Sequence, residues 1–237
     1  MRLDKYLAQM SMGTRSEVKK FIKSGRVFVN GAPASGPEQK VTEEDNVELD
    51  GEKVSYEKYV YYMLNKPQGV VSATKDNTCR TVLSLITDSS KKDIFPVGRL
   101  DKDTEGLLLI TNDGALSHEL LAPGKHVEKT YYARIKGMVT KKEVAAFAEG
   151  VDIGDELLTA PAELKIHKAG SESEIEITIT EGRYHQIKRM FEAVGMQVLY
   201  LKRLRMGPLY LDESLACGEY RKLTTEEIQS LKNREEW

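Results

Sequence analysis

One stretch, residues 98–114, constrains the fold of this chain more than any other. It reads G-R-L-D-K-D-T-E-G-L-L-L-I-T-N-D-G, so a polar turn with Asp101 leads directly into the apolar run Leu107 to Ile110. A short apolar run bounded by turn residues is typical of a buried strand. A side chain in such a turn is held by rigid structure on one side and can be directed into a cleft. The stretch therefore predicts a buried strand with a functional carboxylate before it.

The same residues allow two other interpretations. Asp101, Asp103 and Thr104 could simply make the turn hydrogen bonds that are common for such side chains. The stretch also resembles the start of a calcium-binding loop, but Asn112 stands where a bidentate Glu is needed. An apolar run also occupies positions where further oxygen ligands should follow. We reject a calcium site and expect no metal.

The remaining sequence alternates short strands and helices without a regular strand–helix–strand rhythm. Three Thr–Glu capping boxes mark helix starts, at Thr14–Glu17, Thr140–Glu143 and Thr224–Glu227. Further helices are expected near 81–86, 115–121 and 185–194, and strands near 129–135, 162–167, 174–180 and 198–205. This pattern predicts an α+β protein with a largely antiparallel mixed β-sheet flanked by helices and loops.

The length of 237 residues allows two domains. Residues 1–54 form a compact pattern of two helices and small hairpins, with a hairpin turn at Asn30-Gly31. A Tyr-rich strand at 59–65 then begins a second pattern, closed by Lys66-Pro67-Gln68-Gly69. We place the boundary near 54–58 and predict domains 1–56 and 57–237.

Composition limits the class of protein. No apolar run is long enough to cross a membrane, and the N-terminus lacks a signal-peptide pattern. Cys79 and Cys217 are far apart, and we expect buried small hydrophobic residues, with neither a disulfide nor a zinc site. The four histidines show no metal-ligand spacing. We expect a cytoplasmic monomer of bacterial type without cofactor.

The net charge of −2 conceals strong segregation. Residues 1–30 hold seven basic and two acidic side chains, and residues 183–205 hold six basic and one acidic. Residues 38–57 hold eight acidic and two basic. Two basic regions on an acidic protein suggest a polyanion bound at two places. Such regions can also be solvated helix faces.

The N-terminal segment resembles the S4 RNA-binding domain. The matching stretches are R-L-D-K-Y-L-A-Q, T-R-S-E-V and S-G-R-V-F-V-N-G. The resemblance implies that the second helix and its flanking turn contact structured RNA. The side chains expected to do so are Arg15, Lys19, Lys20 and Arg26.

The second segment resembles the pseudouridine synthases of the ribosomal small-subunit and related large-subunit type. Four stretches carry the match, at 62–69 (Y-M-L-N-K-P-Q-G), 98–114, 128–131 (E-K-T-Y) and 181–191 (E-G-R-Y-H-Q-I-K-R-M-F). The resemblance implies an isomerase that detaches uracil from its ribose, rotates it and rejoins it through carbon, without cofactor or metal.

The resemblance also implies residue roles. Asp101 matches the nucleophile, because a carboxylate can stabilise or capture the ribosyl carbon when the glycosidic bond breaks. Lys188 matches the neighbouring cation, although the wider superfamily often has Arg there, which can grip a carboxylate with two bonds. Tyr131 matches the tyrosine that can stack on uracil and assist removal of the C5 proton. His185 and Gln186 are expected to order the helix start.

Three further residues are expected at the substrate. Ile187 is predicted to form a wall of the base pocket. Arg99 is predicted to hold the flipped nucleotide open, or else to contact a phosphate or form a surface salt bridge. Lys66, in the Y-M-L-N-K-P-Q-G stretch, is counted with the substrate- and RNA-binding residues.

The leading hypothesis is an enzyme acting on 16S ribosomal RNA, free or within a small-subunit assembly intermediate. A large-subunit relative acting on 23S ribosomal RNA is a close alternative, because the same motifs would serve either target. A non-catalytic S4 RNA-binding assembly factor is an alternative of another class. The complete set of Asp101, Tyr131 and Lys188 speaks against it.

Overall fold

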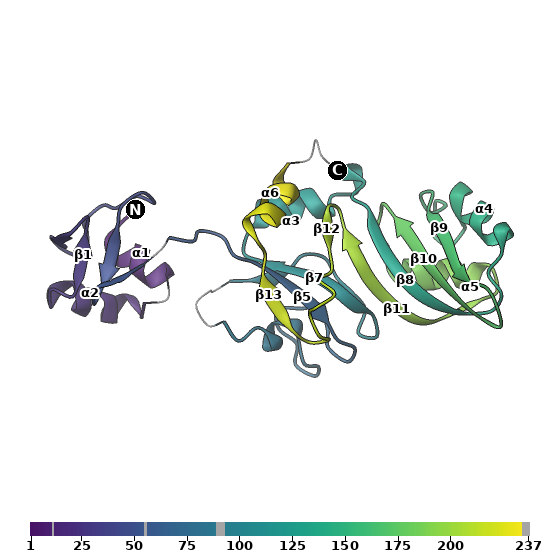
Figure 1. The fold of residues 1–237 in the computed structure, drawn as a ribbon, viewed down its shortest axis with the longest axis horizontal. Coiled ribbons are helices and arrows are strands. Elements are labelled where there is room, and N and C mark those ends of the chain that lie inside the picture. The colour runs from purple at the N-terminus through teal and green to yellow at the C-terminus, as the bar shows by residue number, and fades with distance from the viewer. Residues whose placement is uncertain (11, 55, 89–92, 234–237) are drawn as a thin grey trace. The chain divides into compact units, whose positions relative to one another are not determined.

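A computed structural model describes residues 1–10, 12–54, 56–88 and 93–233. The chain forms two compact units (Figure 1). The first comprises residues 1–60 with the described part of 87–94, and the second comprises 61–86 and the chain from residue 95 onward.

The first unit combines two helices with a small antiparallel sheet. The helices are α1 (Leu3–Gln9) and α2 (Arg15–Lys23). The strands are β1 (Val27–Val29), β2 (Ala32–Pro33), β3 (Val47–Leu49) and β4 (Glu52–Lys53), in the order β2-β1-β3-β4. The predicted capping box is confirmed, because Thr14 accepts from the Glu17 amide and the Glu17 carboxylate accepts from the Thr14 amide. Asn30 and Gly31 both have positive φ, as the predicted hairpin turn requires.

The core of the first unit forms where the helices meet the sheet. Apolar side chains at helical spacing, such as Leu3 and Leu7 on α1 and Val18 and Ile22 on α2, are almost fully buried against Val27. This packing leaves the basic side chains of α2 on the opposite, exposed face.

The second unit is built on one mixed sheet (Figure 1). Its strands are β5 (Tyr61–Lys66), β6 (Phe95–Pro96), β7 (Glu105–Thr111), β8 (Lys129–Lys136), β9 (Glu163–Lys168), β10 (Glu172–Ile179), β11 (Gln197–Met206), β12 (Leu209–Tyr210) and β13 (Tyr220–Lys222). The order is β13-β5-β7-β11-β8-β10-β9, with β12 beside β11 and β6 beside β7. The pairing of β7 with β11 is parallel, and the other pairings within this sheet are antiparallel. The predicted α+β class with a largely antiparallel sheet is confirmed.

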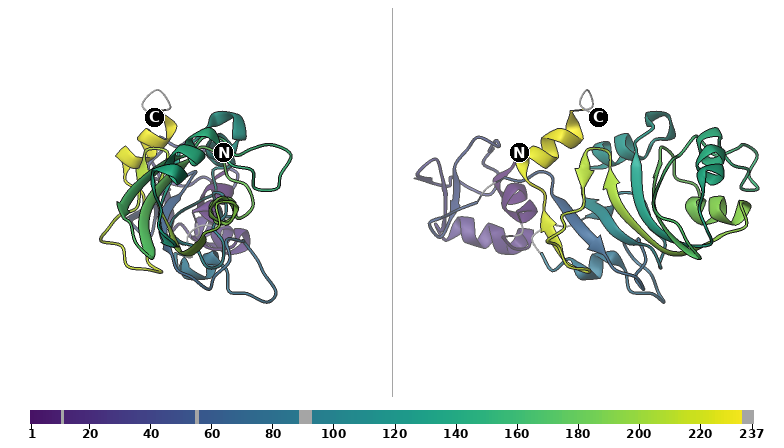
Figure 2. Two further views of the ribbon diagram at one scale, coloured as in Figure 1. Left: turned by 90° about the vertical axis from the view of Figure 1, so that its right-hand side faces the viewer. Right: turned by 45° about the vertical axis from the view of Figure 1, so that its right-hand side comes forward.

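Helices and helical turns connect these strands. They are η1 (Val82–Leu85), α3 (Gly114–Leu121), η2 (Pro123–Lys125), α4 (Lys141–Glu149), α5 (Gln186–Ala193) and α6 (Thr225–Lys232). The capping boxes of α4 and α6 are confirmed. The helix expected near 81–86 is only a short 3₁₀ turn. Figure 2 shows α4 and α5 close together at one end of the sheet, where Phe147 and Phe191 meet edge to face with ring centroids 5.0 Å apart.

Strand β7 lies in the middle of the sheet, as its apolar run predicts. Leu107, Leu108, Leu109 and Ile110 are all at most 1% exposed. The strand begins with a close approach to β11, because a Cβ added at Gly106 would lie 2.2 Å from the carbonyl oxygen of Arg203. Only glycine allows this spacing.

The cysteines correct one expectation. Cys79 is half-buried and Cys217 is exposed, so neither is the buried small hydrophobic residue that we expected. Cys217 follows β12 in a segment without regular secondary structure. Both are free thiols. Within the described ranges, no helix is long and apolar enough to cross a membrane.

Candidate active site

Asp101 lies in a turn that is fixed from several sides. The amide of Thr104 donates to the Asp101 carbonyl at 3.1 Å, and β7 starts at the next residue. On the other side, the Ser72 hydroxyl donates to the carbonyl of Leu100 at 2.9 Å and accepts from its amide at 3.1 Å. The backbone that carries the carboxylate is therefore held independently of the carboxylate itself.

Lys66 supports the same turn from inside the protein, which corrects its predicted role as a substrate- or RNA-binding residue. Its side chain is fully buried, and Nζ donates to the carbonyls of Pro67 (3.0 Å), Asp101 (3.0 Å) and Thr104 (2.9 Å). Burial lowers its pKa to about 8. Because all three donors of the ammonium are used inside the protein, Lys66 positions the Asp101 turn and is not a residue that contacts RNA.

The structure brings Asp101 and Lys188 together across 87 positions of sequence. Lys188 Nζ lies 3.1 Å from Asp101 Oδ2 and 2.6 Å from Asp103 Oδ1. Burial favours the neutral amine of Lys188, but these two carboxylates outweigh it and raise its pKa. Burial likewise acts to raise the pKa of Asp103, yet the Lys188 ammonium lowers it overall. At neutral pH, Lys188 is therefore a cation in contact with Asp101.

His185 is a second side chain at Asp101, which corrects the expectation that it orders the helix start, because its side chain makes no cap hydrogen bond to α5. Its Nε2 lies 3.5 Å from Asp101 Oδ1, so Asp101 sits between the histidine and Lys188. His185 has left-handed backbone geometry (φ 49°) just before α5, and its ring stacks on Tyr184 at 3.9 Å between centroids. Tyr184 is 72% exposed. The signal available in the sequence was the Tyr-His pair directly before a helix that carries Lys188.

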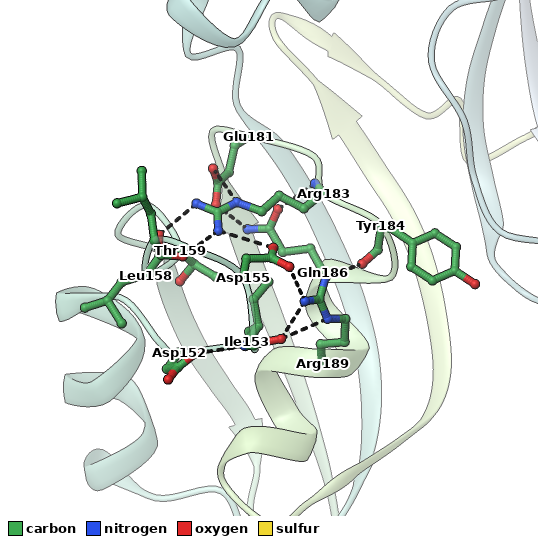
Figure 3. A network of polar contacts seen from close by, with 12 residues as sticks. Asp152, Ile153, Asp155, Leu158, Thr159, Glu181, Arg183, Tyr184, Gln186 and Arg189 are labelled. Atoms are coloured by element: carbon green, nitrogen blue, oxygen red, sulfur yellow. Dashed lines mark hydrogen bonds and ion pairs between the residues drawn. The ribbon is translucent and has the colours of Figure 1, made fainter.

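Gln186 orders the start of α5, as predicted. Its Oε1 accepts from the Arg183 amide at 2.9 Å, and its Nε2 donates to Glu181 Oε1 at 2.9 Å. The wider network around it is shown in Figure 3. Arg183 donates to the carbonyls of Leu157 and Leu158, both at 2.7 Å, and so ties the 153–158 loop to the segment that precedes α5.

Arg189 completes this network from within α5. Its guanidinium donates to the Ile153 carbonyl and pairs with Asp155 (Figure 3). Asp155 also pairs with Arg183 at 3.4 Å. The helix that carries Lys188 is thus fastened at its start and on its side.

These contacts change the interpretation of residues 183–205, the second basic region, as a place where a polyanion binds. Arg183 and Arg189 are engaged with Asp155 and the loop carbonyls, Arg203 is buried, and Arg205 pairs with Glu128 at 3.0 Å. These four arginines are therefore engaged within the protein, and they do not form a free surface for a polyanion.

A cleft of about 660 Å³ joins the predicted site residues in the second unit. Asp101, Lys188, Tyr131, Ile187 and Arg99 all line it. Tyr131 comes from β8 and is 7% exposed, whereas Ile187 comes from α5 and is 4% exposed. Arg99 is exposed and also lines a neighbouring cleft that shares Asp101, so it lies at the entrance. The arrangement offers a carboxylate, a cation and an aromatic side chain to one bound group.

The first unit places Arg15, Lys19 and Lys20 on the exposed face of α2. Arg26 is different, because its guanidinium forms two bonds to Asp50, at 2.7 and 2.5 Å, and lies 4.3 Å from the centre of the Phe21 ring. It is exposed but already paired. In the part of the chain that the structure describes, no cluster of His, Cys, Asp and Glu side chains could hold a metal ion.

Two family models match the chain. The model described as RNA pseudouridylate synthase matches residues 60–193, and the S4 domain model matches residues 1–47. These ranges contain Asp101, Tyr131 and Lys188 in the former and the basic face of α2 in the latter.

Curated relatives match over nearly the full length. An uncharacterized RNA pseudouridine synthase of Bacillus subtilis is 48% identical, with 98% of each chain covered. Ribosomal small subunit pseudouridine synthase A of Yersinia pestis is 42% identical, again with 98% of each covered. Ribosomal large subunit pseudouridine synthase B of Bacillus subtilis is 40% identical, with 98% of this chain and 95% of the relative covered. A crystal structure of a pseudouridylate synthase is similar with a TM-score of 0.69 and 39% identity, covering 98% of this chain and 99% of that one.

Proposed function

The chain belongs to the RNA pseudouridylate synthase family, and from this premise we propose that it converts one uridine of 16S ribosomal RNA to pseudouridine through Asp101. The observation that carries the proposal is the Asp101 carboxylate at 3.1 Å from Lys188, in a cleft lined by Tyr131. We further propose domains of residues 1–56 and 57–237, in line with the matched ranges 1–47 and 60–193. The enzyme is an isomerase that acts on RNA, and we place it in the cytoplasm as a monomer.

In the proposed reaction, a carboxylate oxygen of Asp101 bonds to C1′ of the uridine while the C1′–N1 bond breaks. The electron pair of the broken bond stays on the base. The base then turns until C5 faces C1′, and a C5–C1′ bond forms as the ester bond to Asp101 breaks and returns its pair to the carboxylate. The C5 proton leaves and N1 takes up a proton, so product and substrate have the same atoms and no cofactor is consumed.

The other residues of the cleft have distinct proposed roles. Tyr131 stacks on the extruded uracil and assists the removal of the C5 proton. Ile187 forms the apolar wall beside it. Arg99, exposed at the entrance, occupies the space that the uridine leaves when it flips out of its stack.

The target within ribosomal RNA is supported by likeness alone. The similarity to small-subunit enzymes favours 16S RNA, and the similarity to a large-subunit enzyme keeps 23S RNA as the alternative. Release of tritium from 16S and 23S transcripts labelled at C5 of uridine tests both. We expect release from 16S RNA. Release from 23S RNA alone would overturn the choice of target, and release from neither would overturn the proposed activity.

The role of Lys188 predicts unequal effects of two substitutions. Lys188→Met removes the cation at Asp101 and should lower the rate of tritium release by about 100-fold or more, as for other preorganised charges in active sites. Lys188→Arg keeps a positive charge at the same place and should stay within about 10-fold of wild type. An equal loss in both variants would contradict the proposal that charge is what Lys188 supplies.

The role of the first unit predicts a change in salt dependence. Replacing Arg15, Lys19 and Lys20 together with Ala removes three exposed charges from α2. The slope of log affinity for ribosomal RNA against log salt should fall by about two to three, because each phosphate contact contributes roughly 0.7–0.9. The matched control replaces Lys5, Lys40 and Lys53, three exposed lysines that lie outside α2 in the same unit. If the triple variant kept the wild-type slope, α2 would not be the RNA-contacting face.

A further inference from the structure

Arg203 is a buried cation of the cleft whose hydrogen-bonding capacity is only partly used. It lines the cleft and is 2% exposed. Its Nε donates to the Leu107 carbonyl at 2.7 Å, which fixes the guanidinium plane, whereas Nη2 is buried without any hydrogen-bond partner among the described residues. A buried donor without a partner costs roughly 1–3 kcal/mol, more when it is charged. Such a cost suggests a ligand that supplies the acceptor.

The backbone places Arg203 beside the predicted site. On β11 it pairs with Tyr131 of β8, so the two side chains project from the same face of the sheet. On its other side it pairs with Gly106 of β7, where the missing side chain allows the strands to approach. Its position is therefore fixed by three strands. The neighbouring Lys202 projects from the opposite face.

A second buried cation lies in the same cleft. Lys129, two residues before Tyr131 on β8, is 8% exposed and donates to the Val127 carbonyl at 2.7 Å. Burial and then the charge of Arg203 lower its pKa to about 8, so at neutral pH it remains mostly protonated. Among the described residues, Lys129 and Arg203 donate to carbonyl groups and contact no carboxylate, and two such cations are an unfavourable arrangement in a protein interior.

The acidic residues that line the cleft do not neutralise this pair. Asp101 is engaged by Lys188, and Glu181 is engaged by Arg183 at 3.2 Å and by Gln186. The cleft thus combines an Asp101 carboxylate that is already paired with Lys188 and an excess of positive charge at Lys129 and Arg203. Thr104, another residue of the lining, also has a buried side-chain oxygen, Oγ1, with no hydrogen-bond partner in the part of the chain that the structure describes.

We propose that Arg203 binds a carbonyl oxygen of the flipped uracil and, with the charge of Lys129, stabilises the base after it has been detached. This inference rests on the proposed function. When the C1′–N1 bond breaks, its electron pair remains on the base, and the negative charge spreads from N1 to the carbonyl oxygens. A fixed guanidinium with a free donor is suited to that charge, because it needs no reorganisation as the charge develops. Arg203 is then a group that touches the substrate in the step that Asp101 begins.

The test compares single-turnover pseudouridine formation by wild type, Arg203→Met, Arg203→Lys and the matched control Lys202→Met. We expect a loss of about 100- to 1,000-fold for Arg203→Met, the range seen when one donor to a developing oxyanion is removed. Lys202→Met should stay near the wild-type rate, because its side chain leaves the opposite face of the sheet. Binding of the RNA, measured separately, should be retained in all four proteins.

A substrate change separates contact from structural support. Transcripts made with 2-thiouridine or 4-thiouridine carry sulfur, a weaker acceptor, in place of one carbonyl oxygen. If Arg203 touches that oxygen, the sulfur should slow wild type but add nothing further to Arg203→Met, whereas effects at independent sites multiply. Should Arg203→Met fail to fold, as judged by its thermal melting, the same cycle is run with Arg203→Lys.

The outcomes distinguish this inference from the proposed function. A non-multiplicative effect at either carbonyl supports the inference and identifies the oxygen. Effects that multiply at both carbonyls, or a rate for Arg203→Met within about threefold of wild type, would overturn it while leaving the activity intact. A wild-type protein that forms no pseudouridine would instead overturn the proposed function.

Discussion

Replacing Asp101 with Asn is expected to lower the rate of pseudouridine formation by about four orders of magnitude or more, the scale seen when a nucleophile is removed. The amide has nearly the same shape, but it carries no charge to stabilise the ribosyl carbon and is a poor nucleophile. The fold should persist, because the contacts that hold the turn involve the backbone carbonyl of Asp101, the Lys66 ammonium and Ser72. Single-turnover release of tritium from C5-labelled ribosomal RNA measures the effect.

Asp103→Asn is the matched control for this change. Asp103 also contacts the Lys188 ammonium, at 2.6 Å, but its side chain is 67% exposed against 29% for Asp101. The variant therefore removes the same type of charge, two residues away, from the same cation. We expect it to stay within about 10-fold of wild type. If Asp103→Asn lowered the rate as much as Asp101→Asn, the effect would come from removing a carboxylate partner of Lys188 and not from removing the nucleophile.

Lys66→Met is expected to have the largest effect on stability. It leaves three carbonyl groups, those of Pro67, Asp101 and Thr104, without their shared donor. At roughly 1 kcal/mol for each group left unpaired, the free energy of unfolding should fall by about 2–3 kcal/mol. The rate should fall as well, because the turn that aims Asp101 loses its support. Urea unfolding monitored by circular dichroism measures the first effect.

Lys102→Met provides the comparison for Lys66. Lys102 lies in the same turn but is exposed, and its Nζ donates to Cys79 Sγ at 3.5 Å. A change within about 0.5 kcal/mol is expected there. If Lys66→Met were no more destabilising than Lys102→Met, the assignment of Lys66 as the anchor of the turn would be wrong.

Local signals predicted the elements of this fold well. Each Thr–Glu capping box, as at Thr14 and Thr140, starts a helix because its two bonds depend only on residues three positions apart. The apolar run of β7 became a central strand because a short apolar run bounded by turn residues is likewise a local signal, typical of a buried strand. The order of the strands could not be derived in this way, because the parallel pairing of β7 with β11 joins segments about 100 residues apart and depends on the close approach at Gly106.

The pairing of Asp101 with Lys188 was predicted from the motifs that carry these residues, and the structure places the two side chains in contact. The roles of other basic residues were harder to predict. The sequence does not show whether the ammonium group of a lysine lies in solvent or donates to buried carbonyls. For this reason Lys66 was wrongly predicted to contact RNA. A run of positively charged residues likewise does not show which acidic residues pair with it. Here Asp155, about 30 positions away, forms ion pairs with both Arg183 and Arg189. The contact of His185 with Asp101 was not predicted either, because His185 was expected only to order the helix start.

The central claim is that Asp101 carries the isomerisation of uridine in ribosomal RNA. It is tested most directly by chromatographic quantification of pseudouridine in 16S and 23S transcripts, after incubation with wild type or Asp101→Asn at equal concentration. Both proteins should bind the RNA equally. We predict new pseudouridine in the 16S transcript with wild type and none with Asp101→Asn. Equal amounts of pseudouridine with the two proteins would contradict the account.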